Sequence, residues 1–211
     1  ASNNTAVGFN SLNANTTGVQ NTAIGASALD ANTTASYNTA IGEKSLSTNI
    51  LGSKSIAVGT FALFNQNPAS AVDMYNVAVG YDAGNAVTTG IENTLIGGLA
   101  GDAITVGEYN IALGARALGA DTKGSQNVAI GAYALTTQNF TSATAAHNVA
   151  VGTNAGRLIT TGYNNTLVGG LTGDALTTGH SNVAMGVSSL GATTTATYNT
   201  AIGISSLEVN T

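Results

Sequence analysis

A five-residue motif that recurs twelve times constrains the fold of this 211-residue chain more than any other feature. It reads Asn, then Thr, Val or Ile, then Ala or Leu, then a large aliphatic residue, then Gly, and it runs from 4–8 to 199–203. The motif glycines are 17, 17, 17 and then 21 residues apart, which gives a 72-residue super-repeat. Repetition on both scales predicts a one-dimensional stack of coils. We therefore expect one repeat domain over 1–211, with super-repeat blocks at 4–75, 76–147 and 148–211.

Each unit is expected to contain a short strand, a turn, a second short strand and another turn. In the motif strand, positions two and four share one face and position three lies on the other. Positions two and four are Thr or aliphatic, whereas position three is Ala in ten units and Leu95 or Leu167 in two. We expect the branched face to fill the coil and the Ala face to pack against another copy of the chain.

Glycines outside the motif carry two further expectations. The glycines that follow the motifs of Leu95 and Leu167, Gly98 and Gly170, are expected to make room for these larger side chains. Several linkers contain Thr-Thr-Gly, as at 88–90, where glycine would supply a turn with positive φ. The sequence thus predicts an all-β solenoid of twelve 17-residue coils.

The first motif position is Asn in eleven units and Ser55 in the other. In a stack these Asn side chains would lie about 4.8 Å apart and could form an amide ladder. The alternative is that Asn is present because it suits turns. Neither role is catalytic. The predicted ladder consists of Asn4, Asn21, Asn38, Asn76, Asn93, Asn110, Asn127, Asn148, Asn165, Asn182 and Asn199.

Composition argues against several classes of function. Only 7% of residues are charged, against roughly 25% in a typical soluble domain. The net charge is −5 and the five Lys and Arg residues are scattered, so we expect no nucleic-acid partner. The chain has no Cys, which excludes disulfides and zinc–thiolate sites, and no apolar run long enough for membrane insertion. The acidic residues are dispersed and no nucleotide-binding or nucleophile motif occurs, so we expect no enzyme, cofactor or metal.

Two 12-residue linkers, at 64–75 and 136–147, interrupt the rhythm every fourth coil. Because protruding loops on a rigid scaffold often carry function, we expect any ligand to bind there. A tolerated insertion or an additional contact between chains is the alternative. Four tyrosines that directly precede a motif Asn, among them Tyr75, could cover the turn or stack on sugars. The candidate ligand-loop residues are Phe64, Asn65, Pro68, Tyr75, Phe140 and His147.

The segments at 21–29 and 127–131 resemble the head repeats of YadA-type trimeric autotransporter adhesins and similar repeats of phage tail fibres. The family repeat is shorter, with a Ser-Val-Ala-Ile-Gly core, so this chain departs from it in turn length. The resemblance covers essentially the whole chain. It implies a left-handed parallel β-roll, three chains packed side by side and an extracellular adhesive role.

From these features we expect a structural fibre or adhesin head or stalk segment on a cell or virion surface. Its expected partners are further copies of itself, as a homotrimer or fibre, and a cell-surface or matrix ligand. Two alternatives remain open at this point: an ice-binding β-solenoid, and a filament subunit that stacks end to end.

Overall fold

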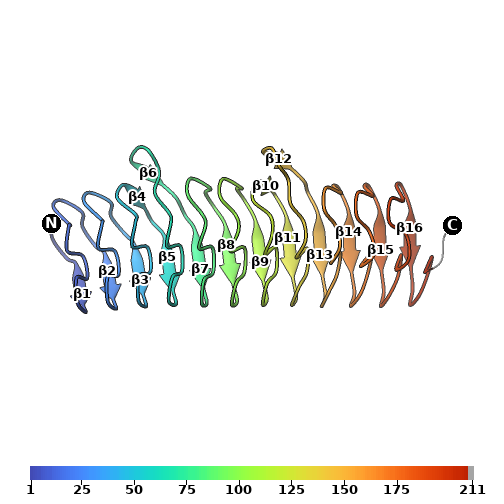
Figure 1. Cartoon of the computed structure of the whole chain (residues 1–211), viewed down its shortest axis with the longest axis horizontal. Coiled ribbons are helices and arrows are strands. Elements are labelled where there is room, and N and C mark those ends of the chain that lie inside the picture. Colours follow the sequence, from blue (N-terminus) through green and yellow to red (C-terminus); the bar gives the residue numbers. More distant parts are fainter. Residues whose placement is uncertain (209–211) are drawn as a thin grey trace.

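The computed structural model describes residues 1–208, which form an all-β parallel solenoid without a helix. The coils follow one another along the long axis of the molecule, with one motif strand in each (Figure 1). Within the described residues the motif strands form one sheet of twelve, termed the main sheet. Its strands are β1 (Thr5–Val7), β2 (Thr22–Ile24), β3 (Thr39–Ile41), β5 (Ile56–Val58), β7 (Val77–Val79), β8 (Thr94–Ile96), β9 (Ile111–Leu113), β11 (Val128–Ile130), β13 (Val149–Val151), β14 (Thr166–Val168), β15 (Val183–Met185) and β16 (Thr200–Ile202).

Every neighbouring pair in the main sheet is parallel and in register with the repeat. Thr22 pairs with Thr39, one 17-residue unit later, and Ile56 pairs with Val77 across the longer 21-residue gap. The motif glycines allow this close stacking. Gly25 has a φ of +137°, and a Cβ there would lie 2.5 Å from the carbonyl oxygen of Gly42 in the next coil. The twelve motif glycines of the sequence are therefore a requirement of backbone geometry.

The interior of the coil is lined by the small face of the motif strand, which reverses the orientation expected from the sequence. Ala23 and Ala40 are fully buried, whereas Ile24 and Ile41 point outward and are more than a third exposed. In most coils a leucine from the following turn, such as Leu29, already fills the interior, so the strand has room only for Ala there. The prediction that the Ala face meets a partner chain is therefore wrong.

Leu95 and Leu167 are fully buried within the coil. The expected role of Gly98 and Gly170 is wrong, because a Cβ at Gly98 would have no neighbour within 4 Å. The space comes instead from a glycine where other coils carry the interior leucine. A Cβ at Gly101 would lie 2.7 Å from Leu95 Cδ2, and one at Gly173 would lie 2.9 Å from Leu167 Cδ2.

The segment after each motif glycine turns sharply and does not form the expected second strand. In the second coil, Ser27 has a φ of +55° and Leu29 a φ of +50°, and this alternation recurs in other coils. It brings Leu29 and the preceding Ala28 inward within four residues. The expectation for the Thr-Thr-Gly linkers is also wrong, because Gly90 is not among the residues with positive φ.

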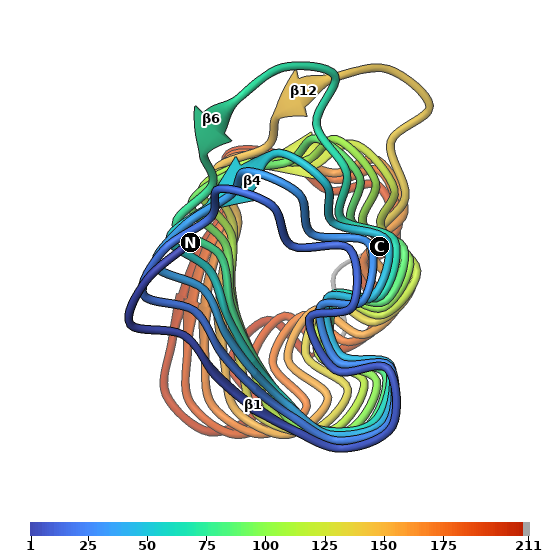
Figure 2. The same ribbon diagram turned by 90° about the vertical axis from the view of Figure 1, so that its left-hand side faces the viewer.

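The two long linkers form loops on the same side of the solenoid, beyond the edge of the ordinary linkers (Figures 1 and 2). Each loop is anchored by a short parallel pair. β4 (Gly52–Ser53) pairs with β6 (Val72–Asp73), and β10 (Gly124–Ser125) pairs with β12 (Thr144–Ala145).

Candidate functional site

The motif Asn side chains are connected along the interior of the solenoid by hydrogen bonds. Asn93 Nδ2 donates to Gly107 O at 2.9 Å and to Asn76 Oδ1 at 3.2 Å, and its backbone N donates to Asn76 Oδ1 at 2.9 Å. The same pattern repeats from Asn93 to Asn110. Each amide thus satisfies one linker carbonyl in its own coil and the backbone N–H of the next motif. Asn93 and Asn110 are fully buried, so the column holds the coils together and is closed to a ligand.

The long linkers add two buried glutamines that the sequence reasoning missed. Gln66 Oε1 accepts a hydrogen bond from Asn76 Nδ2 at 3.0 Å, and Gln66 Nε2 donates to Ser55 Oγ at 3.1 Å. Gln66 therefore connects the column at the one unit that begins with Ser. Gln138 lies at the equivalent position of the next super-repeat, and its Oε1 accepts from Asn148 Nδ2 at 2.8 Å. The signal in the sequence was their shared position, seven residues after a motif glycine.

The predicted ligand-loop residues are divided between the interior and the surface. Pro68 is buried and Phe140 is only 6% exposed, so neither can act as a surface ligand contact. Phe64 and Asn65 are half-buried; Asn65 Nδ2 donates to Asn85 Oδ1 at 3.1 Å. Tyr75 and His147 are exposed. The structure therefore buries single side chains such as Pro68 and Phe140 as anchors and leaves the loop tips at 69–73 and 141–143, together with Tyr75 and His147, accessible.

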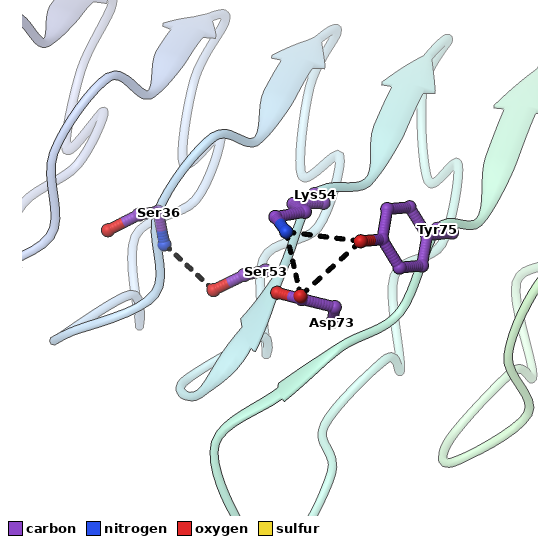
Figure 3. A network of polar contacts seen from close by, with 5 residues as sticks. All are labelled: Ser36, Ser53, Lys54, Asp73 and Tyr75. Carbon is purple, nitrogen blue, oxygen red and sulfur yellow. Dashed lines mark hydrogen bonds and ion pairs between the residues drawn. The ribbon is translucent and has the colours of Figure 1, made fainter.

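Tyr75 belongs to a polar network at the base of the first long loop (Figure 3). Lys54 Nζ donates to Asp73 Oδ2 at 2.7 Å and to the Tyr75 hydroxyl at 3.1 Å. The Tyr75 hydroxyl lies 3.4 Å from the same carboxylate oxygen, to which it donates. The hydrogen bond that Lys54 donates to Asp73, and then the one that it donates to Tyr75, favour the ammonium form and raise the pKa of Lys54 above its ordinary value. β6 supplies Asp73, so the long loop fixes the position of this tyrosine.

The outer face of the main sheet is a long accessible surface. Positions two and four of every motif point outward, and all of them are Thr, Val, Ile, Leu or Met. Ile96, Ile111 and Ile130 are each between 37% and 39% exposed. With strands about 4.8 Å apart and about 3.3 Å per residue, this face measures about 58 Å by about 10 Å. No charged side chain interrupts it within the part of the chain that the structure describes.

The acidic side chains of residues 1–208 do not gather into a cluster that could hold a metal ion. Burial raises the pKa of Asp102 above its ordinary value; its own backbone N–H and then Arg116 oppose the rise, and the negative charge of Asp82 adds to it. Burial likewise raises the pKa of Asp174, against the charge of Arg157. Among residues 1–208 there is no group of three or more His, Asp or Glu side chains placed to hold a metal ion. The described residues also contain no helix that is long and apolar enough to cross a membrane.

Comparisons with protein-family models, with curated proteins and with solved structures find no match to this chain.

Proposed function

We propose that this chain is an extracellular structural fibre segment whose copies pack side by side through the outer face of the main sheet. The observation that carries the proposal is the unbroken, uncharged character of this face. From strand spacing and length the face spans about 600 Å², which is at the upper end of the largest patches on monomeric proteins, where such patches often mark interaction sites. The expected occupant is a second copy, because it presents the same flat surface with the same coil spacing.

The area also indicates how the copies meet. A standard interface buries about 800 Å² per partner, which is more than the strand residues alone provide. Side chains at the margins of the main sheet must then contribute to the contact. Because each chain has one such face, the assembly closes around a shared axis instead of growing sideways. On the resemblance to trimeric adhesin heads, we propose three copies and a left-handed roll.

The test is the molar mass of the chain in solution. Replacing outward Ile96 and Ile130 by Lys places two charges on the main-sheet face of every copy, and burying them is costly. Size-exclusion chromatography with light scattering should give a trimer for the unmodified chain and a monomer for I96K/I130K. The control is Y133K, which adds a charge at an exposed position outside the main sheet. If light scattering shows that the unmodified chain is a monomer even at high concentration, the proposal is refuted.

A placement on a cell or virion surface, with adhesion to a host surface or matrix, completes the proposal. It is supported by the resemblance, by the low charge and by the two loops that project from one side of the solenoid. Binding of fluorescently labelled chain to intact cells, with I96K/I130K as a comparison, tests whether assembly and adhesion go together.

Ice binding is a second candidate, and the orientation of the motif strand favours it. Thr occupies position two in six of the twelve motifs, and that position faces outward beside a row of aliphatic side chains. A flat array of Thr and aliphatic residues is the surface expected of an ice-binding solenoid. Thermal hysteresis measured on the unmodified chain distinguishes the two, because the fibre proposal predicts none.

A further inference from the structure

A column of exposed side chains follows the line where the linkers enter the motif strands. The residues of this column, termed the tyrosine column, each directly precede the first motif position. Their backbones are alike, with φ values of +62° at Tyr37, +61° at Lys54, +51° at Tyr75, +56° at Glu92 and +58° at Tyr109. The main-sheet register places them in successive coils. Because the strands are in register, the residues of the column recur evenly, one in each coil.

Aromatic and polar residues alternate in this column. Tyr37, Tyr75 and Tyr109 are 53%, 49% and 45% exposed, and Lys54 and Glu92 lie between them. Because tyrosine occurs in every second coil, the three rings recur about 9 to 10 Å apart. Gln126 and His147 continue the column with further polar groups that can form hydrogen bonds. Such regular spacing selects for a ligand that is itself periodic.

The central ring of the column is held in place before any ligand binds. The Tyr75 hydroxyl accepts a hydrogen bond from Lys54 Nζ at 3.1 Å and donates one to Asp73 Oδ2 at 3.4 Å (Figure 3). Lys54 Nζ lies 5.2 Å from the centre of the Tyr75 ring. A side chain fixed in this way loses little entropy on binding. If the tyrosine only covered the turn, it would not need an ion pair from the long loop to orient it.

We propose that the tyrosine column binds an extended, β-1,4-linked polysaccharide, with Tyr37, Tyr75 and Tyr109 stacking on sugar rings. In such a glycan successive rings are flipped, so the same ring face recurs at every second sugar, a repeat similar to that of the tyrosines. Glu92 and Gln126 would hydrogen-bond to sugar hydroxyls between the stacked rings. Weak contacts at several points along one chain add up to useful affinity.

A nucleic acid is a poorer fit for this column. Aromatic side chains also stack on bases, but such sites combine stacking with a positively charged groove. Here Glu92 lies in the column, Lys54 is paired with Asp73, and the chain carries a net charge of −5. The chemistry on the surface therefore favours a neutral, hydroxyl-rich partner.

This inference rests on the adhesive part of the proposed function and names its ligand class. It does not require self-association, because all the residues of the column come from one chain. Failure of the fibre proposal would appear as a monomer in light scattering, whereas failure of this inference would appear as absence of glycan binding by an otherwise unchanged protein.

The experiment is isothermal titration calorimetry of the full chain with chitohexaose and cellohexaose, and with α-1,4-linked maltohexaose as the mismatched glycan. We expect binding of at least one β-1,4-linked hexasaccharide and none of maltohexaose. Y75A and Y109A should each weaken binding about tenfold. Y75F keeps the aromatic ring and should weaken glycan binding less than Y75A does. Y133A removes a tyrosine of similar exposure outside the column and should leave affinity unchanged.

The inference is overturned by three results. The first is that neither β-1,4-linked hexasaccharide binds. The second is that maltohexaose binds as well as the β-linked glycans. The third is that Y133A weakens binding as much as Y75A while circular dichroism shows all variants folded.

Discussion

Leu95 fills the space that a side chain at Gly101 would need, since a Cβ there would lie 2.7 Å from Leu95 Cδ2. In the more common coils the strand contributes Ala and the following turn contributes Leu, as at Ala23 and Leu29. In the coil of Leu95 the strand contributes the large side chain, and the turn contributes Gly101 in place of a leucine. Leu95 also borders Gly84 of the preceding coil, where a Cβ would lie 2.7 Å from Leu95 Cδ1, so this one side chain occupies space beside two glycines.

This exchange predicts strong coupling between the two positions. L95A should lower the free energy of unfolding by about 2–5 kcal/mol, because it leaves a cavity. G101L alone should destabilise by about 1–3 kcal/mol through overpacking. The double variant L95A/G101L restores the common arrangement and should be more stable than the sum of the two losses predicts. Urea unfolding of all four proteins measures the cycle, and simple additivity would contradict the account.

The adjacent glycines Gly97 and Gly98 should respond differently to the same substitution. Gly97 has a φ of +133°, and a Cβ there would lie 2.6 Å from the carbonyl oxygen of Gly114. We expect G97A to destabilise by at least about 2 kcal/mol. G98A adds a methyl group where no atom lies within 4 Å and should change stability by less than about 0.5 kcal/mol. Equal melting temperatures for the two variants would be inconsistent with the stacking described.

The Asn column should be a major contributor to stability. N93A removes the donor to Gly107 O and the acceptor for Asn110 N, both buried. We expect a loss of about 1–3 kcal/mol for each group left unsatisfied. N67A is the control, because Asn67 is exposed, and it should be close to neutral. Chemical denaturation compares them; a neutral N93A would show that the column contributes only turn preference.

The raised pKa of Asp102 predicts a specific dependence of stability on pH. Its main cause is burial, so the folded state holds the proton more tightly than the unfolded state. As pH falls through the raised folded pKa toward the unfolded value, the unmodified chain gains stability. D102N cannot titrate, so it should melt higher at pH ~7, and its advantage should shrink as pH falls to ~4. Melting curves of both proteins across this pH range test the prediction. A difference in melting temperature that stays constant or widens as pH falls would contradict it.

The repeat predicted the architecture because its two periods leave few alternatives. The spacing of the motif glycines located the strands, and the motif Asn residues were placed in one column. The direction of the strand faces could not be derived from the sequence. Both faces are apolar, and only the turn that brings Leu29 inward decides which face has room. Reasoning from side-chain size therefore placed the branched face inside.

For the two long loops, too, the sequence predicted some features and not others. Their positions followed from the longer gap in the repeat, whereas the burial of Phe140 and the role of Gln66 depend on how each loop returns to the coil. The network of Lys54, Asp73 and Tyr75 joins residues from two coils and a loop. No local pattern in the sequence marks such a contact.

Cysteine cross-linking shows directly whether copies of this chain meet through the outer face of the main sheet. The chain has no cysteine, so a single one introduced by V128C reports only on its own surroundings. In a parallel assembly around one axis, equivalent residues of the main sheet approach one another. We predict that V128C forms intermolecular disulfides under mild oxidation, whereas Y133C, which lies outside the main sheet, does not. Equal cross-linking of both variants, or none of V128C, would contradict it.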